Sequence, residues 1–216
     1  MRIILVLFIV AAFLFCTGLS AQTDTSVAPP IKKANKEYRA AMHQEFLDSA
    51  QTPLTADGLK HFRKIQWYPI RARYRVMATL TLTPDALPFE MPRSKGNTGT
   101  YRKYGVAHFV LNGVECDLSL YQYMKLINDA QYKDDLFLPF ADATNGESTY
   151  GSGRFIELKI PTGDTLVIDF NQAFNPLCAY NAKYSCPIPP AENRLSIEIK
   201  AGMKKYKGHQ DEKVTK

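Results

Sequence analysis

Apolar residues recur at helical spacing near the start of the chain and at alternate positions through most of the remainder. Between residues 32 and 49, apolar positions recur every three or four residues among strong helix formers, which predicts a long amphipathic helix. Thr55 precedes Gly58 by three residues, and Leu59 and Phe62 follow on one apolar face. We therefore expect a short helix with Thr55 as its N-cap. From Tyr74 onward the period changes to two, which indicates strands.

The clearest turn signal in the chain is the pair Asn112-Gly113. It lies between the alternating runs 101–111 and 114–121, and both positions of a two-residue type I′ turn require positive φ angles. We therefore predict a β-hairpin at this position. Residues 136–140 then indicate a short strand that ends at a polar block.

Two further segments complete the predicted sheet. Residues 155–160 and 165–170 flank a turn that contains Gly163, which predicts a second hairpin. The alternation from Leu195 to Ile199 predicts a half-buried last strand. No crossover helix of sufficient length separates the later strands, so antiparallel connections are expected. The sequence thus predicts a β-rich α+β domain, in which two N-terminal helices pack on an antiparallel sheet or a partly closed barrel.

The first 21 residues have the order of a secretory signal peptide, with a charge at Arg2, an apolar run and a small-residue site that ends at Ala21. The apolar run is shorter than the roughly 20 residues of a spanning helix, which argues against a membrane anchor. A lipoprotein signal would modify Cys16, but Phe15 stands where a small residue is expected. We expect a periplasmic or secreted protein with no membrane contact after signal cleavage.

The mature chain is expected to form one domain over residues 22–202, because about 195 residues can bury a core without disulfides. The net charge of +6 is concentrated in residues 203–216, where five lysines accompany two acidic residues. Such a tail is typical of solvated disorder. Basic residues alternate with aromatic ones only around Lys103, so nucleic acid is not an expected partner. The sequence does not indicate an oligomeric state.

Signal cleavage leaves Cys116, Cys178 and Cys186. In an oxidising compartment Cys178 and Cys186 are near enough in sequence to form a disulfide, with Cys116 left free. Alternatively, all three are small buried apolar side chains. The gap between Cys178 and Cys186 is wider than that of a zinc knuckle, and no metal site is predicted. Phosphate-binding loop motifs are missing from the sequence, and no cofactor is predicted.

Three polar segments rich in glycine, proline and aromatic residues follow the predicted strands, at 142–154, 169–178 and 186–194. If these segments meet at one end of the β-core, their side chains line a pocket. Amides, carboxylates and aromatic faces suit a small polar molecule such as a carbohydrate or glycan. The candidate ligand-binding residues are Asp142, Thr144, Arg154, Asp169, Asn171, Asn175, Glu192 and Arg194.

Two other interpretations of the polar segments stay open. Two carboxylates among Asp142, Asp169 and Glu192 could divide acid and base roles in a hydrolase, although spacing alone does not show which. Alternatively the segments are structural, or serve an interaction domain without a ligand. In that case Asp142 pairs with Arg154, Asp169 caps a turn, and Asn175 bonds to loop backbone.

Several short motifs follow one another in a fixed order along residues 38–202. They are Thr100-Tyr-Arg-Lys-Tyr-Gly105, the block 142–154, Asp169-Phe-Asn171 with Asn175-Pro176, and Cys186-Pro187 with Pro189-Pro190 and Asn193-Arg194. Together they resemble the DUF1684 family of uncharacterised proteins, and with its signal peptide the chain resembles a short, exported form. The resemblance implies a shared fold and a shared site, and it names no substrate.

Overall fold

The computed structural model describes residues 29–208. The predicted signal peptide lies outside these residues, and it stays a prediction. The helices and strands are α1 (Pro29–Leu47), α2 (Ala56–His61), β1 (Arg75–Leu82), β2 (Phe89–Pro92), β3 (Thr98–Leu111), β4 (Val114–Tyr123), β5 (Asp135–Phe140), β6 (Arg154–Lys159) and β7 (Thr165–Asp169). Four short 3-10 helices accompany them, η1 (Ala72–Tyr74), η2 (Phe170–Gln172), η3 (Leu177–Ala179) and η4 (Ala191–Asn193).

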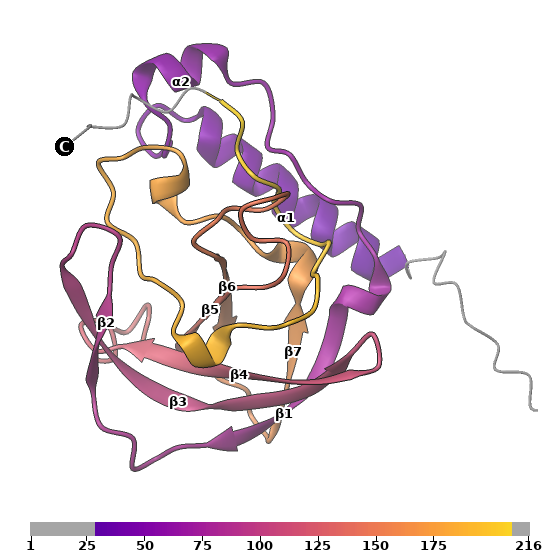
Figure 1. The fold of residues 1–216 in the computed structure, drawn as a ribbon, viewed down its shortest axis with the longest axis vertical. Coiled ribbons are helices and arrows are strands. Elements are labelled where there is room, and N and C mark those ends of the chain that lie inside the picture. The colour runs from indigo at the N-terminus through magenta and orange to yellow at the C-terminus, as the bar shows by residue number, and fades with distance from the viewer. Residues whose placement is uncertain (1–28, 209–216) are drawn as a thin grey trace, which may run out of the picture.

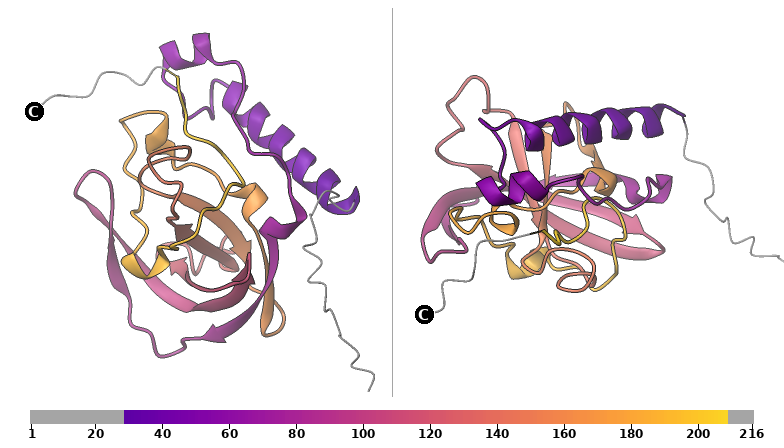
Figure 2. Two further views of the ribbon diagram at one scale, coloured as in Figure 1. Left: turned by 45° about the vertical axis from the view of Figure 1, so that its right-hand side comes forward. Right: turned by 90° about the horizontal axis from the view of Figure 1, so that it is seen from above.

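The seven strands form one antiparallel sheet in the order β6-β5-β4-β3-β1-β7, and β2 pairs with the first part of β3. The sheet curls into a half-barrel, and α1 runs across its open side (Figure 1). Figure 2 shows the same helix from above, lying over the concave interior. The predicted α+β class with a partly closed barrel is therefore confirmed. Within residues 29–208 there is no helix long and apolar enough to cross a membrane.

Both helices form where the sequence predicts them. The predicted N-cap of α2 is confirmed, because the Thr55 hydroxyl accepts a hydrogen bond of 2.9 Å from the Gly58 amide. The α1 helix buries Phe46, whose ring meets that of Tyr180 edge to face at a centroid distance of 4.9 Å. The α1 helix is therefore attached to the segment that follows β7, rather than to the sheet alone.

The Asn-Gly hairpin is confirmed in its turn and its register. Asn112 and Gly113 have φ angles of 53° and 79°, and Leu111 faces Val114 across the turn. The two positive angles give the turn a twist that matches the twist of the flanking strands. These strands, β3 and β4, form the longest ladder of the sheet.

The second predicted hairpin is wrong. Strand β6 pairs with β5, whereas β7 pairs with β1, so the two strands form opposite edges of the curled sheet. Gly163 lies in the connection without the positive φ angle of a tight hairpin turn. In sequence both strands alternate apolar with polar residues over part of their length, and such a pattern does not specify the neighbouring strand. The order of the strands in the whole sheet decides which strands pair, and this order depends on contacts between segments far apart in the chain.

The predicted last strand is wrong in its pairing and right in its burial. Leu195 and Ile199 are buried while Ser196 and Glu198 are exposed, as a half-buried strand requires. The segment nevertheless lies outside the sheet ladders. Its backbone bonds to the loop after β5, for example from the Ala143 amide to the Ile197 carbonyl at 3.1 Å.

The packed chain extends beyond the predicted domain boundary at Gly202. Met203 is buried, and its amide donates to the Ala173 carbonyl at 2.8 Å. The amides of Lys204 and Lys205 bond to the carbonyls of Gln66 and Ser148. The first part of the predicted tail thus packs against the domain because Met203 supplies an apolar anchor. The rest of the predicted tail, from residue 209, lies outside the described residues.

The core of the described residues consists of two large clusters and a smaller third one around Met91, Tyr101 and Tyr121. Residues such as Leu118, Leu138, Ile168 and Phe170 fill the half-barrel. A second cluster fills the space between the helices and the C-terminal segments, and contains Phe46, Phe62, Tyr180 and Met203. Burial of these apolar surfaces is the main favourable term in folding. The space that remains open lies between α1, β6 and the segments that follow β7.

Candidate functional site

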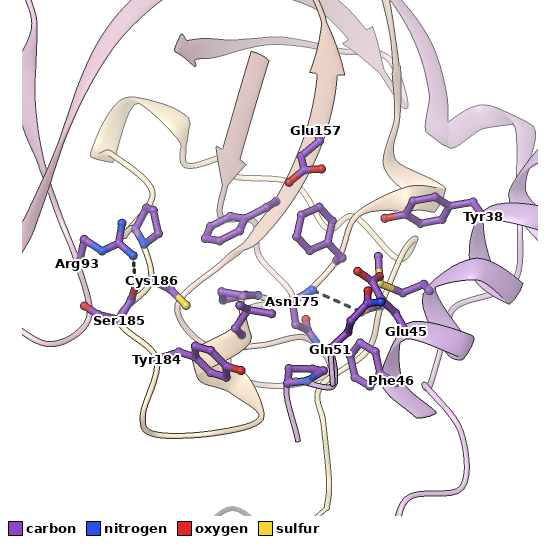
Figure 3. A pocket seen from close by; sticks show the side chains of 18 residues that line it. Tyr38, Glu45, Phe46, Gln51, Arg93, Glu157, Asn175, Tyr184, Ser185 and Cys186 are labelled. Atoms are coloured by element: carbon purple, nitrogen blue, oxygen red, sulfur yellow. Dashed lines mark hydrogen bonds between the residues drawn. The ribbon is translucent and has the colours of Figure 1, made fainter. Parts of the chain in front are cut away.

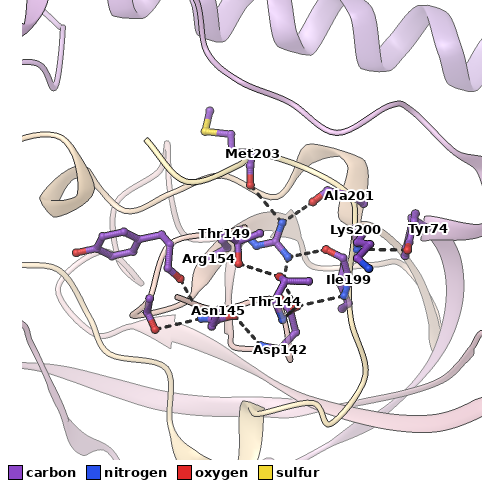
Figure 4. Close-up of polar contacts among 12 residues, drawn as sticks. Tyr74, Asp142, Thr144, Asn145, Thr149, Arg154, Ile199, Lys200, Ala201 and Met203 are labelled. Atoms are coloured by element: carbon purple, nitrogen blue, oxygen red, sulfur yellow. Dashed lines mark hydrogen bonds and ion pairs between the residues drawn. The ribbon is translucent and has the colours of Figure 1, made fainter. Parts of the chain in front are cut away.

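The polar block after β5 contains a fully buried ion pair. The Arg154 guanidinium donates to Asp142 Oδ2 at 2.7 Å, and neither side chain is exposed to solvent (Figure 4). Asp142 Oδ1 accepts from the amide and the hydroxyl of Thr144 and from the Ile199 amide, at 2.9, 2.6 and 3.1 Å. Burial lowers the pKa of Arg154, and the adjacent Asp142 carboxylate opposes that shift. The predicted pairing of Asp142 with Arg154 is confirmed.

The Arg154 side chain supplies the C-terminal segment with hydrogen-bond donors that an adjacent strand would otherwise provide. Its guanidinium donates to the carbonyls of Ile199, Ala201 and Met203, which alternate along an extended chain. Buried carbonyls require donors, and here a side chain supplies them because no strand lies alongside. The pair therefore fixes the end of the domain: both terminal guanidinium nitrogens donate to protein oxygens, while the buried Nε has no partner among the described residues.

A second polar cluster lies under α1. Asp169 caps η2 by accepting from the Asn171 amide at 3.0 Å, as the structural interpretation predicts. Its other oxygen accepts from Asn35 on α1 at 2.9 Å and from Arg75 at 3.2 Å. The Asn171 side chain bonds to the amide and carbonyl of Arg71 at 3.0 Å each. These contacts join α1 to the β7 edge of the sheet.

The remaining predicted site residues lie apart from each other. Asn175 is buried and donates to the Lys204 carbonyl at 2.9 Å. Glu192 lies on the other side of the molecule, where it accepts from Lys103 at 2.7 Å and from Tyr121 at 2.6 Å beside a shallow groove. Arg194, two residues further along the chain, is exposed. The eight candidate residues therefore do not meet in one pocket.

The main cavity lies between α1, the face of β6 that carries Phe155 and Glu157, and the segments that follow β7. Its volume is about 580 Å³, which is within the usual range for small-molecule sites. Aromatic rings from α1, from β6 and from the segment after β7 form much of its wall. Among the eight candidate ligand-binding residues, only Asn175 contributes to the lining.

A second cavity of about 530 Å³ adjoins the first along the face of β4, β5 and β6 that carries Tyr121, Phe137 and Phe155. The two share five lining residues, namely Arg93, Phe155, Glu157, Leu177 and Pro187. Tyr101 and Tyr123, whose rings stack at a centroid distance of 4.9 Å, line the second cavity. The shared residues therefore stand where a ligand could extend from one cavity into the other.

Two polar groups of the cavity walls lack partners. Asn175 is 3 % exposed, and its Oδ1 accepts no hydrogen bond from residues 29–208. The Nε of Arg93 is likewise without a partner among these residues, although another guanidinium nitrogen donates to the Ser185 carbonyl (Figure 3). Buried polar atoms without partners are rare in native proteins. The residues that line the cavity thus include one buried acceptor and one buried donor without partners among the described residues.

Acidic and phenolic groups complete the cavity. Figure 3 shows Glu157 and Tyr38 on one side of it and Arg93 on the other. Although the Glu157 side chain still reaches solvent, desolvation raises its pKa, and the negative charges of Asp135 and Glu45 raise it further. Burial, followed by the charge of Glu157, raises the pKa of Tyr38, so its hydroxyl stays protonated.

We predict that protein stability decreases with rising pH because of Glu157. A raised pKa means that the folded state binds a proton that the unfolded state has released. The stabilisation is therefore fully present below the unfolded pKa, ordinarily 4.5, and it is lost as the pH rises through the folded pKa. Urea unfolding of the wild type and Glu157→Gln at a series of pH values measures this. If the free energy of unfolding has the same pH dependence in Glu157→Gln as in the wild type, the prediction is contradicted.

The sequence offers little indication of Arg93 and Glu157. Arg93 follows β2 and has no motif around it, while Glu157 has the pattern of an outward polar residue on a strand. They line the same cavity because the tertiary fold brings β6 near the turn after β2. The described residues contain no group of three or more histidine, cysteine, aspartate or glutamate side chains able to bind a metal.

The fold and site define a β-rich half-barrel with a long helix, and an aromatic-walled cavity lies between that helix and strand β6. The chain belongs to the DUF1684 family, described as a protein family of unknown function, whose model matches residues 60–204. Among solved structures it is similar to the solution NMR structure of an uncharacterised protein of Haloarcula marismortui. That likeness has 29 % identity and a TM-score of 0.64, and it covers 80 % of this chain and 93 % of the other. A comparison with curated proteins finds none that matches.

Proposed function

We propose that this protein binds a small polar organic molecule in the cavity between α1 and the half-barrel, with a carbohydrate as the favoured class. The observation that carries the proposal is the coincidence of unpartnered polar atoms with aromatic walls in one cavity. Asn175 Oδ1 can accept from a hydroxyl, and Arg93 Nε can donate to an oxygen. Phe155, Phe174 and Tyr184 provide apolar rings around them.

The surrounding chemistry favours a molecule with several hydroxyls over a purely apolar one. A sugar has an apolar face that packs on aromatic rings and hydroxyls that bond to planar polar side chains. The cavity provides carboxyl groups at Glu45 and Glu157 and an amide at Gln51 besides the unpartnered atoms. The buried pair of Asp142 and Arg154 supports this cavity from outside instead of binding the ligand.

We expect a panel of mono- and disaccharides, including sugar acids, to contain at least one compound that raises the melting temperature of the purified protein. Calorimetric titration of that compound should show affinity weakened at least about tenfold in Arg93→Gln, since a hydrogen bond to a charged group contributes about 1.5–3 kcal/mol. A similar loss is expected for Glu157→Gln.

Lys200→Gln is the matched control for charge removal. Lys200 is paired with Glu198 at the surface, away from the cavity, and its replacement should leave the affinity unchanged. Equal affinity in Arg93→Gln and the wild type would exclude this cavity as the binding site. A panel in which no sugar stabilises the wild type would refute the carbohydrate class.

One observation also favours a second candidate function, a carboxylate-based hydrolase. Glu45 and Glu157 line the same cavity, and the charge of Glu45 contributes to the raised pKa of Glu157. Two carboxyl groups with different affinities for protons can divide acid and base roles. The same sugar panel decides between the functions, because cleaved products detected by mass spectrometry indicate a hydrolase and intact sugars indicate binding alone.

A further inference from the structure

Cys178 and Cys186 meet at the edge of the main cavity. The Cys178 amide donates to Cys186 Sγ at 3.2 Å, and the two thiol side chains hydrogen-bond each other. Both sulfurs are free thiols in the structure, and the disulfide expected from the sequence stays a prediction. The cysteines come from different local structures, namely η3 and an extended segment whose neighbour Pro187 bridges to Arg93.

The two thiols differ in accessibility. Cys178 is half-buried and follows the exposed Leu177, whereas Cys186 is 6 % exposed. An incoming reagent therefore reaches Cys178 first. Cys186 lies behind it and lines the cavity.

The surroundings favour a thiolate at Cys178. The Tyr150 hydroxyl lies 3.6 Å from its sulfur, and the Cys186 thiol is a second hydrogen-bond partner. The hydrogen bond from Cys186 is the main cause that lowers the pKa of Cys178, and the same bond raises the pKa of Cys186. Burial raises the pKa of Tyr150, so its hydroxyl keeps the proton that it donates. Arg93 is the charged residue next to the pair.

We propose that Cys178 and Cys186 form a thiol–disulfide exchange site, in which Cys178 is the attacking thiol and Cys186 the resolving thiol. The substrate class is a small accessible disulfide. This site is separate from the proposed ligand cavity in its chemistry, and it does not depend on a ligand there.

The exchange proceeds in two balanced steps. The Cys178 thiolate attacks one sulfur of the disulfide, so that a mixed disulfide forms, the original sulfur–sulfur bond breaks, and one thiolate leaves and takes a proton. Cys186 then loses its proton to solvent and attacks the Cys178 sulfur, which releases the second thiol. The protein dithiol is oxidised by two electrons, and the substrate disulfide is reduced to two thiols.

The test uses glutathione disulfide as the probe on the reduced protein, with Cys116→Ala as the common background. Cys116 is buried, and burial raises the pKa of its thiol, so it is an unreactive reference in the wild type. With both cysteines present, mass spectrometry should find a Cys178–Cys186 disulfide. In Cys186→Ala, the mixed disulfide with glutathione should accumulate at Cys178, at least about tenfold faster than at Cys186 in Cys178→Ala.

Two results would overturn the proposal. One is a wild-type protein that gives only mixed disulfides and no internal bond. The other is a Cys178 that reacts no faster than Cys186 in the single-cysteine variants. If a variant fails to fold, limiting iodoacetamide on the native wild type, followed by peptide mapping, still decides the matter, because preferential alkylation of Cys178 over Cys116 is required.

Discussion

Replacement of Asp142 by alanine is expected to lower the free energy of unfolding by about 3–5 kcal/mol, because it leaves the Arg154 charge buried without its partner. Both side chains are fully buried, so water cannot replace the lost carboxylate. The Ile199 amide and the Thr144 amide lose their acceptor at the same time. Urea unfolding followed by circular dichroism measures the effect as a lower midpoint at an unchanged slope.

The control for Asp142→Ala is Glu198→Ala, which removes a pair with Lys200 that is half-exposed on the neighbouring segment. Exposed pairs contribute at most about 1 kcal/mol, so this variant should unfold close to the wild type. A loss in Asp142→Ala as small as that of Glu198→Ala would show that the buried pair does not fix the C-terminal segment.

The second large effect is expected for Gly202→Ala, with a loss of about 3 kcal/mol or more. Gly202 has a φ of 72°, and a Cβ at this position would lie 2.5 Å from the Ala173 carbonyl oxygen and 2.8 Å from that of Phe170. Both neighbours are backbone atoms and cannot rotate away. The Ala173 carbonyl also accepts from the Met203 amide, so the substitution strains the contact by which the C-terminal segment closes the domain.

Gly96→Ala separates the two causes of that strain. Gly96 has a similar φ of 78°, but a Cβ there would meet no atom within 4 Å. This control should lose only the roughly 1–2 kcal/mol of a left-handed alanine. Thermal or urea unfolding of the two variants gives the difference, and equal losses would mean that the close approach to Ala173 is unimportant.

The sequence predicted local features of the fold well and its long-range pairings poorly. The Thr55 cap and the Asn112-Gly113 turn were predictable because each depends on a few adjacent residues. The pairing of β6 and β7 was not, because alternation fixes which face of a strand is buried and leaves its partner open. The order of strands in the complete sheet determines that β6 pairs with β5 and β7 with β1.

The candidate site shows the same division. Composition correctly indicated that the block 142–154 is a dense polar network, and it left open whether the network faces a ligand or the protein. The structure shows Asp142 and Arg154 bonded to the chain itself. The cavity is lined instead by Arg93 and Glu157, which are ordinary surface residues by local pattern.

The sequence by itself determined the class of this protein, the family motifs, its two helices and its central hairpin, because these depend on periodicity and short-range turn chemistry. Only the tertiary structure decided that Arg154 donates hydrogen bonds to the carbonyls of the last segment and that Cys178 lies beside Cys186. The tertiary structure also decided where the cavity lies. The curl of the sheet brings these groups together from segments far apart in the chain, and no local pattern encodes that curl.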